Sequence, residues 1–298
     1  MSCSCKNCQS NCEFIPPVRA LEMIYAGITD ECDVVSVAWE REEGKVYRYD
    51  LPIPKNLDSK ARKYVAHVVE RIAKFVLWAA GGWKLWLAGP DEIVKPLKKA
   101  YSKTGIRKFD FDFFSSIYGR KVEVEIVPFA KMPEQKEKFS QVKTVADGNR
   151  IGFDLGASDF KISALKKGKV VFSKEFPWDP RNQADPEYHY QKLTAGLKEA
   201  ASTLGKVDAI GGSTAGVLVG QKMGLASLFR AVKEKNPSKF EIAQNMFYRI
   251  EKDWGVPFAV YNDGDVTALA GMISMNKQGI LGVAMGSSEA VGYVDPKR

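Results

Sequence analysis

The alternation of apolar and polar positions predicts two α/β units joined by a polar segment. Residues 33–40 and 45–53 alternate with a period of two around a charged, glycine-containing turn, which is typical of a β-hairpin. A helix is predicted over 59–79, because Asn56 or Asp58 can cap its first turn and apolar residues recur at helical spacing. The unit continues with a short strand at 84–88, a helix over 91–102 and an alternating strand at 122–127.

The second unit follows the same order of elements and then extends it. Strands are predicted within 151–165 and over 169–176, followed by a proline-bearing loop, a helix over 186–204 and a strand at 207–211. A region of mixed helices is expected over 225–254. The last part predicts a strand at 256–261, a helix that includes 266–275, and two strands at 279–284 and 290–294.

The two units also share short sequences. GKVYRYDLPIP at 44–54 parallels GKVVFSKEFPWDP at 168–180, and WKLWLAGPDE at 83–92 parallels VDAIGGSTAG at 207–216. This indicates an internal repeat of hairpin, helix and strand. Chance similarity between short α/β stretches is the alternative.

Together these patterns predict an α/β fold with mixed sheets flanked by helices. The segment 130–149 is polar, rich in lysine and poorly periodic, so a linker is expected there. The expected organisation is a cysteine-rich tail at 1–30, an α/β module at 31–130, a linker at 131–149 and a second module at 150–298.

Composition is that of a globular protein, with 45% hydrophobic and 27% charged residues in 298. No apolar run reaches the roughly 20 residues that span a bilayer, and the N-terminus lacks the apolar core of a signal peptide, so we expect a cytoplasmic protein with no membrane partner. The formal net charge of +8 suits an anionic small ligand such as a nucleotide. The lysines are not interleaved with arginine and aromatic residues, so no nucleic-acid partner is expected.

Four of the five cysteines crowd near the N-terminus, at Cys3, Cys5, Cys8 and Cys12, whereas Cys32 stands apart. Four thiolates can form a tetrahedral Zn²⁺ site, but the spacing lacks the paired CxxC arrangement of common zinc modules. An unliganded, frayed tail is the equal alternative.

Three loops at predicted strand ends carry the residue types that phosphate chemistry needs. In the first, Asp154 ends an apolar run and can hold Mg²⁺ through water, while the small residues of 156–158 let phosphate oxygens approach the backbone. The second loop is 262–265, and the third is the turn at 286–288. Ligands gather at the carboxyl ends of strands in α/β sheets, so these loops are expected to lie together. An ordinary turn is the alternative for the first and third loops.

Asp263 follows a strand and precedes a helix, where a carboxylate is well placed to act as general base for a substrate hydroxyl. An Asp at this point also makes a good helix N-cap without any catalytic role. Asp265 is a second candidate for the cap, which would leave Asp263 free.

Four segments in this order resemble the sugar kinases of the ROK family, within the superfamily of actin-like ATPases and sugar kinases. FDLGASDFK at 153–161 looks like the family's first phosphate loop, and VDAIGGSTAG at 207–216 looks like its central strand and glycine loop. VPFAVYNDGDVTALAG at 256–271 looks like the segment with the catalytic aspartate, and GVAMGSSEAVGYV at 282–294 looks like the second phosphate loop.

The resemblance implies actin-like ATPase modules of the ribonuclease H-like type. It also implies ATP-dependent phosphoryl transfer to a hydroxyl of a sugar or related small polyol, with ATP and Mg²⁺ as cofactors. Asp263 would be the base and Asp154 would lie near Mg²⁺. The substrate would be contacted by Asn262, Gly212 and Ser213, and the ATP phosphates by Gly156, Ala157, Ser158, Gly286, Ser287 and Ser288. A catalytically inactive relative that binds or senses a sugar or nucleotide is the alternative.

The chain also departs from the family. The resemblance covers 150–295, about half of the chain, whereas the family continues beyond its second phosphate loop with an adenosine pocket and, in many members, a zinc site. The sequence therefore predicts either the absence of that continuation or its replacement by residues 30–130, as in a circular permutation. Asp159 places an acid beside the first phosphate loop, which is unfavourable unless it points away or meets Mg²⁺. A monomer and a homodimer both remain open.

Overall fold

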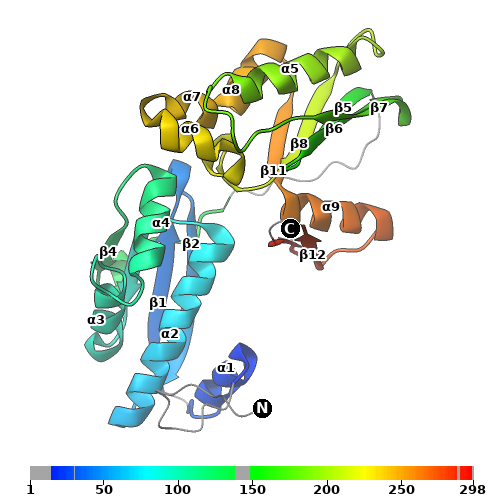
Figure 1. Ribbon diagram of the computed structural model, residues 1–298. Coiled ribbons are helices and arrows are strands. Elements are labelled where there is room, and N and C mark those ends of the chain that lie inside the picture. Colours follow the sequence, from blue (N-terminus) through cyan, green and yellow to red (C-terminus); the bar gives the residue numbers. More distant parts are fainter. Residues whose placement is uncertain (1–14, 30, 138–147, 287–288, 297–298) are drawn as a thin grey trace, which may run out of the picture. The chain divides into compact units, whose positions relative to one another are not determined.

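The structure is a computed structural model that describes residues 15–29, 31–137, 148–286 and 289–296. The chain divides into two compact units, Met1–Lys138 and Phe139–Arg298 (Figure 1). The expected fold class is confirmed, since mixed α/β sheets with packed helices form both units. Among the described residues, no helix is both long enough and apolar enough to cross a membrane.

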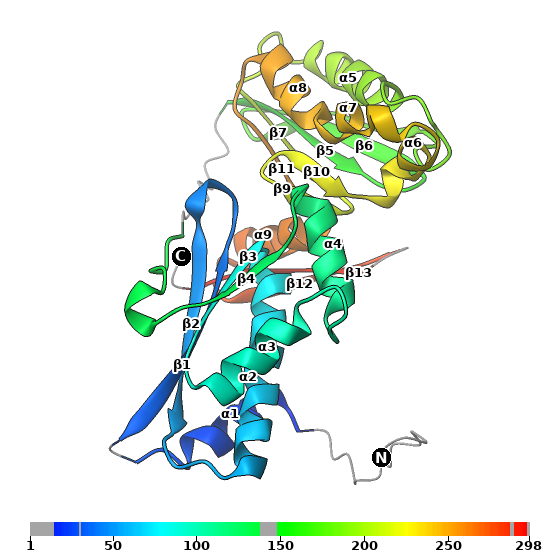
Figure 2. The same ribbon diagram turned by 90° about the vertical axis from the view of Figure 1, so that its left-hand side faces the viewer.

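The first unit is built on a four-stranded sheet with the order β2-β1-β3-β4. The strand β1 pairs antiparallel with both β2 and β3, and β3 pairs parallel with β4. The long helix α2 runs along this sheet in both views (Figure 2). The strands are β1 (Cys32–Glu40), β2 (Val46–Pro54), β3 (Lys84–Ala88) and β4 (Glu123–Ile126), and the helices are α1 (Pro17–Tyr25), α2 (Ser59–Ala80), α3 (Asp91–Ala100) and α4 (Lys108–Tyr118).

Two polar contacts fix the α2 helix. Its N-cap is Asp58, as predicted, since the carboxylate accepts the N–H of Ala61 at 2.7 Å. Glu70, on the buried side of α2, forms an ion pair with Arg107 just before α4, in which Nη2 donates to Oε2 at 3.0 Å. Helix α4 was not expected from the sequence, because the run FDFDFF alternates with a period of two and hides the helical periodicity.

Residues 132–137 contact the first unit, so this part of the expected linker is structured. The side chain of Met132 is buried, Lys136 bridges to Val46 of β2, and Glu137 forms an ion pair with Arg41. The sequence pattern hid this because only a few positions of a short, irregular segment contact the sheet.

The second unit contains a five-stranded sheet with the order β11-β8-β5-β6-β7. Strands β5, β6 and β7 form an antiparallel meander. Strand β8 pairs parallel with β5, and β11 pairs parallel with β8, so the carboxyl ends of β5, β8 and β11 lie at one edge of the sheet. The strands are β5 (Asn149–Leu155), β6 (Asp159–Lys166), β7 (Lys169–Pro177), β8 (Ala209–Thr214) and β11 (Phe258–Asn262).

Helices cover this sheet through an aromatic core. Phe153 of β5 stacks on Phe258 of β11 and on Phe247 of a covering helix, with ring centroids 6.0 and 6.2 Å apart. The helices are α5 (Tyr188–Ala201), α6 (Arg230–Lys235), α7 (Phe240–Gln244) and α8 (Met246–Trp254).

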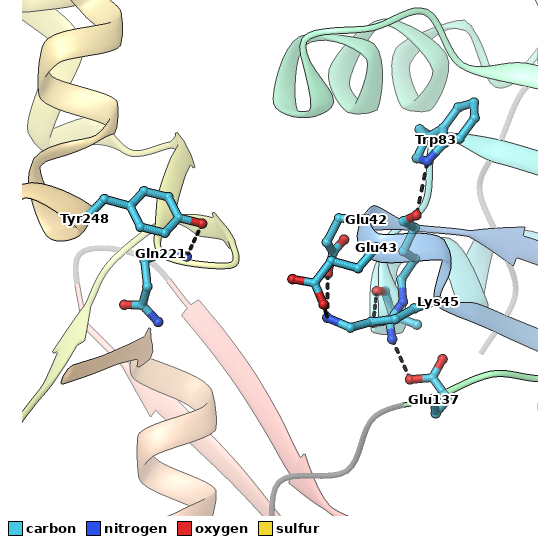
Figure 3. A network of polar contacts seen from close by, with 9 residues as sticks. Glu42, Glu43, Lys45, Trp83, Glu137, Gln221 and Tyr248 are labelled. Carbon is cyan, nitrogen blue, oxygen red and sulfur yellow. Dashed lines mark hydrogen bonds and ion pairs between the residues drawn. The ribbon is translucent and has the colours of Figure 1, made fainter. Parts of the chain in front are cut away.

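A small hairpin of β9 (Val217–Val219) and β10 (Lys222–Leu225), which was not predicted, lies just before the region expected to be helical. Its turn is held by the Tyr248 hydroxyl, which accepts the N–H of Gln221 at 3.4 Å (Figure 3). The Gln221 side chain in turn accepts the N–H of Val260 at 3.0 Å, which satisfies a donor on the edge strand β11.

The second unit ends with α9 (Asp263–Met275) packed on a hairpin of β12 (Ile280–Met285) and β13 (Glu289–Val294). The first turn of α9 lies against the β13 backbone, because a Cβ on Gly264 would come within 2.6 Å of the Val291 backbone. Glycine is therefore required for this approach. The contact holds the start of α9 against the hairpin of β12 and β13.

The expected internal repeat does not extend to the topology of the sheets. In the first unit the strand after the helix, β3, pairs antiparallel with β1. In the second unit the corresponding strand, β8, pairs parallel with β5. Strand β5 itself has no counterpart in the first sheet. The shared short sequences therefore reflect similar local patterns of strand and turn.

Candidate functional site

The second unit contains a cavity of about 800 Å³ at the carboxyl ends of its parallel strands. It lies between the turn after β5, the end of β8, the first turns of α9 and the end of β12. Several residues singled out in the sequence line it: Asp154, Gly156, Ala157, Ser158, Ser213, Asp263 and Gly286. The parallel pairing of β5, β8 and β11, together with the packing of α9 on β12 and β13, thus brings together residues from all three predicted loops.

The first turn is tight and polar. Asp154 is paired in register with Ser213 of β8, whose hydroxyl donates to Oδ1 of Asp154. At Gly156 a Cβ would lie 2.8 Å from the carbonyl oxygen of Asp159, so the turn has no room for a side chain there. Gly156, Ala157 and Ser158 of this tight turn line the cavity, and small residues are what a backbone anion site requires.

Asp159 is held by its neighbours. Its Oδ2 accepts the Ser158 hydroxyl at 2.8 Å, and its Oδ1 lies 3.7 Å from Nζ of Lys161. Asp159 is not among the residues that line the cavity. The Asp159 carboxylate is thus engaged by Ser158 and Lys161 and does not form part of the cavity lining.

The N-cap of α9 is Asn262, rather than Asp263 or Asp265. Its Oδ1 accepts the N–H of Gly264 at 2.9 Å, and its Nδ2 donates to the Gly216 carbonyl at 2.7 Å. Asn262 is not among the cavity-lining residues, so its expected contact with substrate stays a prediction. The cap leaves the Asp263 carboxyl uncommitted.

Asp263 is the first residue of α9 and faces the cavity. Its Oδ1 is buried and has no hydrogen-bond partner among the described residues. Burial, and secondly the negative charge of Asp154, raise the pKa of the Asp263 carboxyl from its ordinary value of 3.8 to about 6. A carboxylate with this pKa is ionised at neutral pH and is still basic enough to accept a proton.

The carboxylates of Asp154 and Asp263 are suitable donors for Mg²⁺, which prefers oxygen ligands and keeps several waters. The orphaned Oδ1 of Asp263 and the repulsion between the two acids fit a hydrated cation nearby. The described residues hold no cluster of three or more His, Cys, Asp or Glu side chains that could bind a metal directly. The side chains therefore suit a cation bound largely through water and phosphate.

Some predicted residues lie elsewhere or outside the description. Gly212 of β8 packs against Phe153, where a Cβ would overlap the phenyl ring, and it does not line the cavity. Its expected substrate contact stays a prediction beside this packing role. Outside the described residues lie Ser287, Ser288 and the proposed zinc ligands Cys3, Cys5, Cys8 and Cys12.

The structure adds residues that sequence reasoning missed. Arg181 lines the cavity from the loop after β7, Ser227 from a short 3-10 helix (Ser227–Phe229) after β10, and Thr267 from the second turn of α9. The sequence indicated only that Arg181 is a basic residue in the proline-bearing loop. Since this loop has no fixed spacing from the other loops, the sequence provided no reason to place Arg181 near them.

No protein-family model matches this chain, and no curated protein matches it. Solved structures that are similar include a ROK hexokinase from Thermus thermophilus, with 18% identity over 50% of this chain and 47% of the hexokinase, and a TM-score of 0.39. A ROK-family transcriptional regulator, a homologue of the E. coli MLC protein, is 19% identical over 50% of this chain and 37% of the regulator, with a TM-score of 0.40.

A third similar structure is the Ppx/GppA phosphatase of Aquifex aeolicus, with 15% identity over 51% of this chain and 50% of the phosphatase, and a TM-score of 0.34. The chain thus spans about half the length of these proteins or less.

Proposed function

We propose that this chain takes part in ATP-dependent phosphoryl transfer to a hydroxyl of a sugar or related small polyol, with its second unit holding the phosphates and the base. The observation that carries the proposal is the Asp263 carboxylate. It does not cap α9, it faces the cavity beside the turn at Gly156, and its pKa is raised. The meander with two added parallel strands supports assignment of this unit to the actin-like ATPase modules.

In the proposed reaction, Asp263 accepts the proton of the acceptor hydroxyl as that oxygen bonds to the terminal phosphorus of ATP. The bond from this phosphorus to the bridging oxygen breaks, and ADP leaves with the bonding electron pair. The glycine turn at 156–158 presents backbone to the phosphates, and Asp154 lies where it can hold the water shell of Mg²⁺. The Mg²⁺ ion, when bound, supplies positive charge against the phosphates.

The test is Mg²⁺-dependent release of ADP with a panel of sugars and polyols, comparing the wild type with Asp263→Asn. Removing the base should lower kcat by about 10²–10⁴-fold and leave ATP binding within a few-fold of the wild type. Asp265→Asn is the matched control, because Asp265 lies on the same helical turn and does not line the cavity. It should keep most of the activity.

The pH profile gives a second readout. Since Asp263 must be ionised to act as a base, kcat/KM should fall as the pH drops through about 6. If wild type binds ATP but turns over with no acceptor in the panel, the inactive binding relative becomes the better reading. If Asp263→Asn keeps full acceptor-dependent turnover, Asp263 is not the base.

A further inference from the structure

We propose that Arg181 binds the terminal phosphate of the bound nucleotide and neutralises the charge that develops there during transfer. The inference rests on the proposed function and adds a catalytic residue that the sequence motifs do not contain. Arg181 lies in the loop between β7 and α5 and lines the same cavity as Asp154 and Asp263.

The loop that carries Arg181 is attached directly to the first phosphate turn. Three residues before Arg181, the indole Nε1 of Trp178 donates to the Gly156 carbonyl at 3.0 Å, and the Trp178 backbone N–H donates to the Ser158 carbonyl at 3.4 Å. The Trp178 ring is itself buried, packed edge-on against Phe160 at 5.1 Å. Arg181 is therefore placed relative to the turn that is expected to hold phosphate, rather than on an independent surface loop.

A second attachment fixes the residue immediately before Arg181. The ring of His189, fully buried at the start of α5, has its Nε2 at 3.0 Å from the Pro180 carbonyl and at 2.8 Å from the Leu228 carbonyl. Leu228 follows Ser227, which also lines the cavity. One buried imidazole thus fixes the two wall segments that carry Arg181 and Ser227.

The charges in the cavity favour a cation at this place. Asp154 and Asp263 both face the cavity, and their repulsion already disfavours ionisation of Asp263. Arg181 is the basic residue among the described residues that line this cavity. A polyphosphate adds further negative charge, and a guanidinium matches phosphate oxygens with paired donors while never losing its proton.

Arginine held in advance beside the reacting group stabilises the transition state without reorganising. The proposal therefore predicts a larger effect on ligands that carry a third phosphate than on those that carry two. It also predicts that lysine will replace arginine only in part, since lysine supplies the charge without the paired donors.

The first experiment uses calorimetry with the full chain, Mg²⁺ and two inorganic probes, tripolyphosphate and pyrophosphate, so that no adenosine pocket or turnover is needed. Arg181→Gln should weaken tripolyphosphate binding by about 10-fold or more and pyrophosphate binding by about 3-fold or less, with Arg181→Lys between it and wild type. Arg249→Gln is the matched control, because Arg249 pairs with Glu187 at 2.6 Å and does not line the cavity. It removes one positive charge from the same unit and should change neither affinity.

The second experiment measures acceptor-dependent ADP release by the same variants, where Arg181→Gln should lower kcat by about 10²-fold or more. If Arg181→Gln loses selectivity for tripolyphosphate and the wild type shows no turnover, the phosphate-binding role of Arg181 stands and the proposed kinase activity is overturned. Wild-type selectivity and turnover in Arg181→Gln overturn the Arg181 proposal and leave the kinase standing. Failure of the wild type to bind tripolyphosphate overturns the Arg181 proposal as well, and an effect of Arg249→Gln equal to that of Arg181→Gln reduces it to a general charge effect.

Discussion

Replacement of Asp263 by asparagine should stabilise the second unit at neutral pH while it lowers the proposed activity. In the folded chain, burial and the charge of Asp154 raise the pKa of this carboxyl from 3.8 to about 6. The folded state therefore binds this proton more tightly than the unfolded state does. Its free energy of unfolding falls as the pH rises from about 4 to about 6, and stays lower above that range. Asparagine has nearly the same shape and no charge, so the free energy of unfolding of the variant should not fall in this way as the pH rises.

The size of the effect follows from the shift. About two pKa units correspond to roughly 3 kcal/mol, which is an upper bound. Asp263 is only half buried, and solvent screens part of the interaction, so we expect about 1 kcal/mol at pH 7.5. For a unit of this size, that corresponds to an increase in Tm of about 2–4 °C.

Urea unfolding of the wild type and Asp263→Asn, followed from about pH 4 to pH 8 without Mg²⁺, measures this difference. The curves should coincide near pH 4 and separate above pH 6, with the variant more stable. In an Asp154→Asn background the gain should shrink, because one cause of the raised pKa is then absent. A gain that is the same at every pH would point to packing instead of charge. A loss of stability at pH 8 would refute the reasoning, since it would mean that the ionised carboxylate makes a stabilising contact.

Two further predictions concern packing in each unit. Gly264→Ala should destabilise the second unit by about 1–3 kcal/mol in urea unfolding, because the added Cβ meets the β13 backbone. Gly152→Ala is the control and should cost much less, because its Cβ would meet nothing within 4 Å. Equal costs would contradict the close contact at Gly264. Glu70→Ala should destabilise the first unit by about 3 kcal/mol, because it removes the closer of two buried carboxylates that pair with the Arg107 guanidinium, while Asp110 stays at 3.8 Å. The exposed Glu22→Ala should change it by less than about 1 kcal/mol, and a similarly small effect at Glu70 would show that its ion pair is not buried in solution.

Much of the local structure could be predicted from the sequence. Helix α2 was expected over 59–79 and is observed over Ser59–Ala80, because a long amphipathic pattern with a capping Asp specifies a helix locally. The last strands and helix of the chain were also close to their predicted positions. Helix α4 was missed because its aromatic and acidic residues alternate like those of a strand.

In the candidate site, the sequence indicated which residues have the right chemistry, and the structure decided which of them meet. Asp154 and Asp263 were both proposed from their places after strands, and both line one cavity. Asn262 shows the limit of local reasoning, since its amide caps α9 and also binds the carbonyl of Gly216, far away along the chain. Asp263 and Asp265 were considered as caps from the sequence, and both predictions were wrong, because the contact that orients Asn262 is with a residue distant in sequence.

The sequence by itself therefore determined most of the strands and helices, the α/β class and the chemistry of the loops at strand ends, because periodicity, capping and turn residues act over a few neighbouring positions. Tertiary structure alone decided the sheet order, the free state of the Asp263 carboxyl, the packing role of Gly212 and the presence of Arg181 in the cavity. The physical reason is the same in each case. These features depend on contacts between segments that are distant in sequence, such as the bond from Trp178 to Gly156, and such contacts leave no regular spacing along the chain.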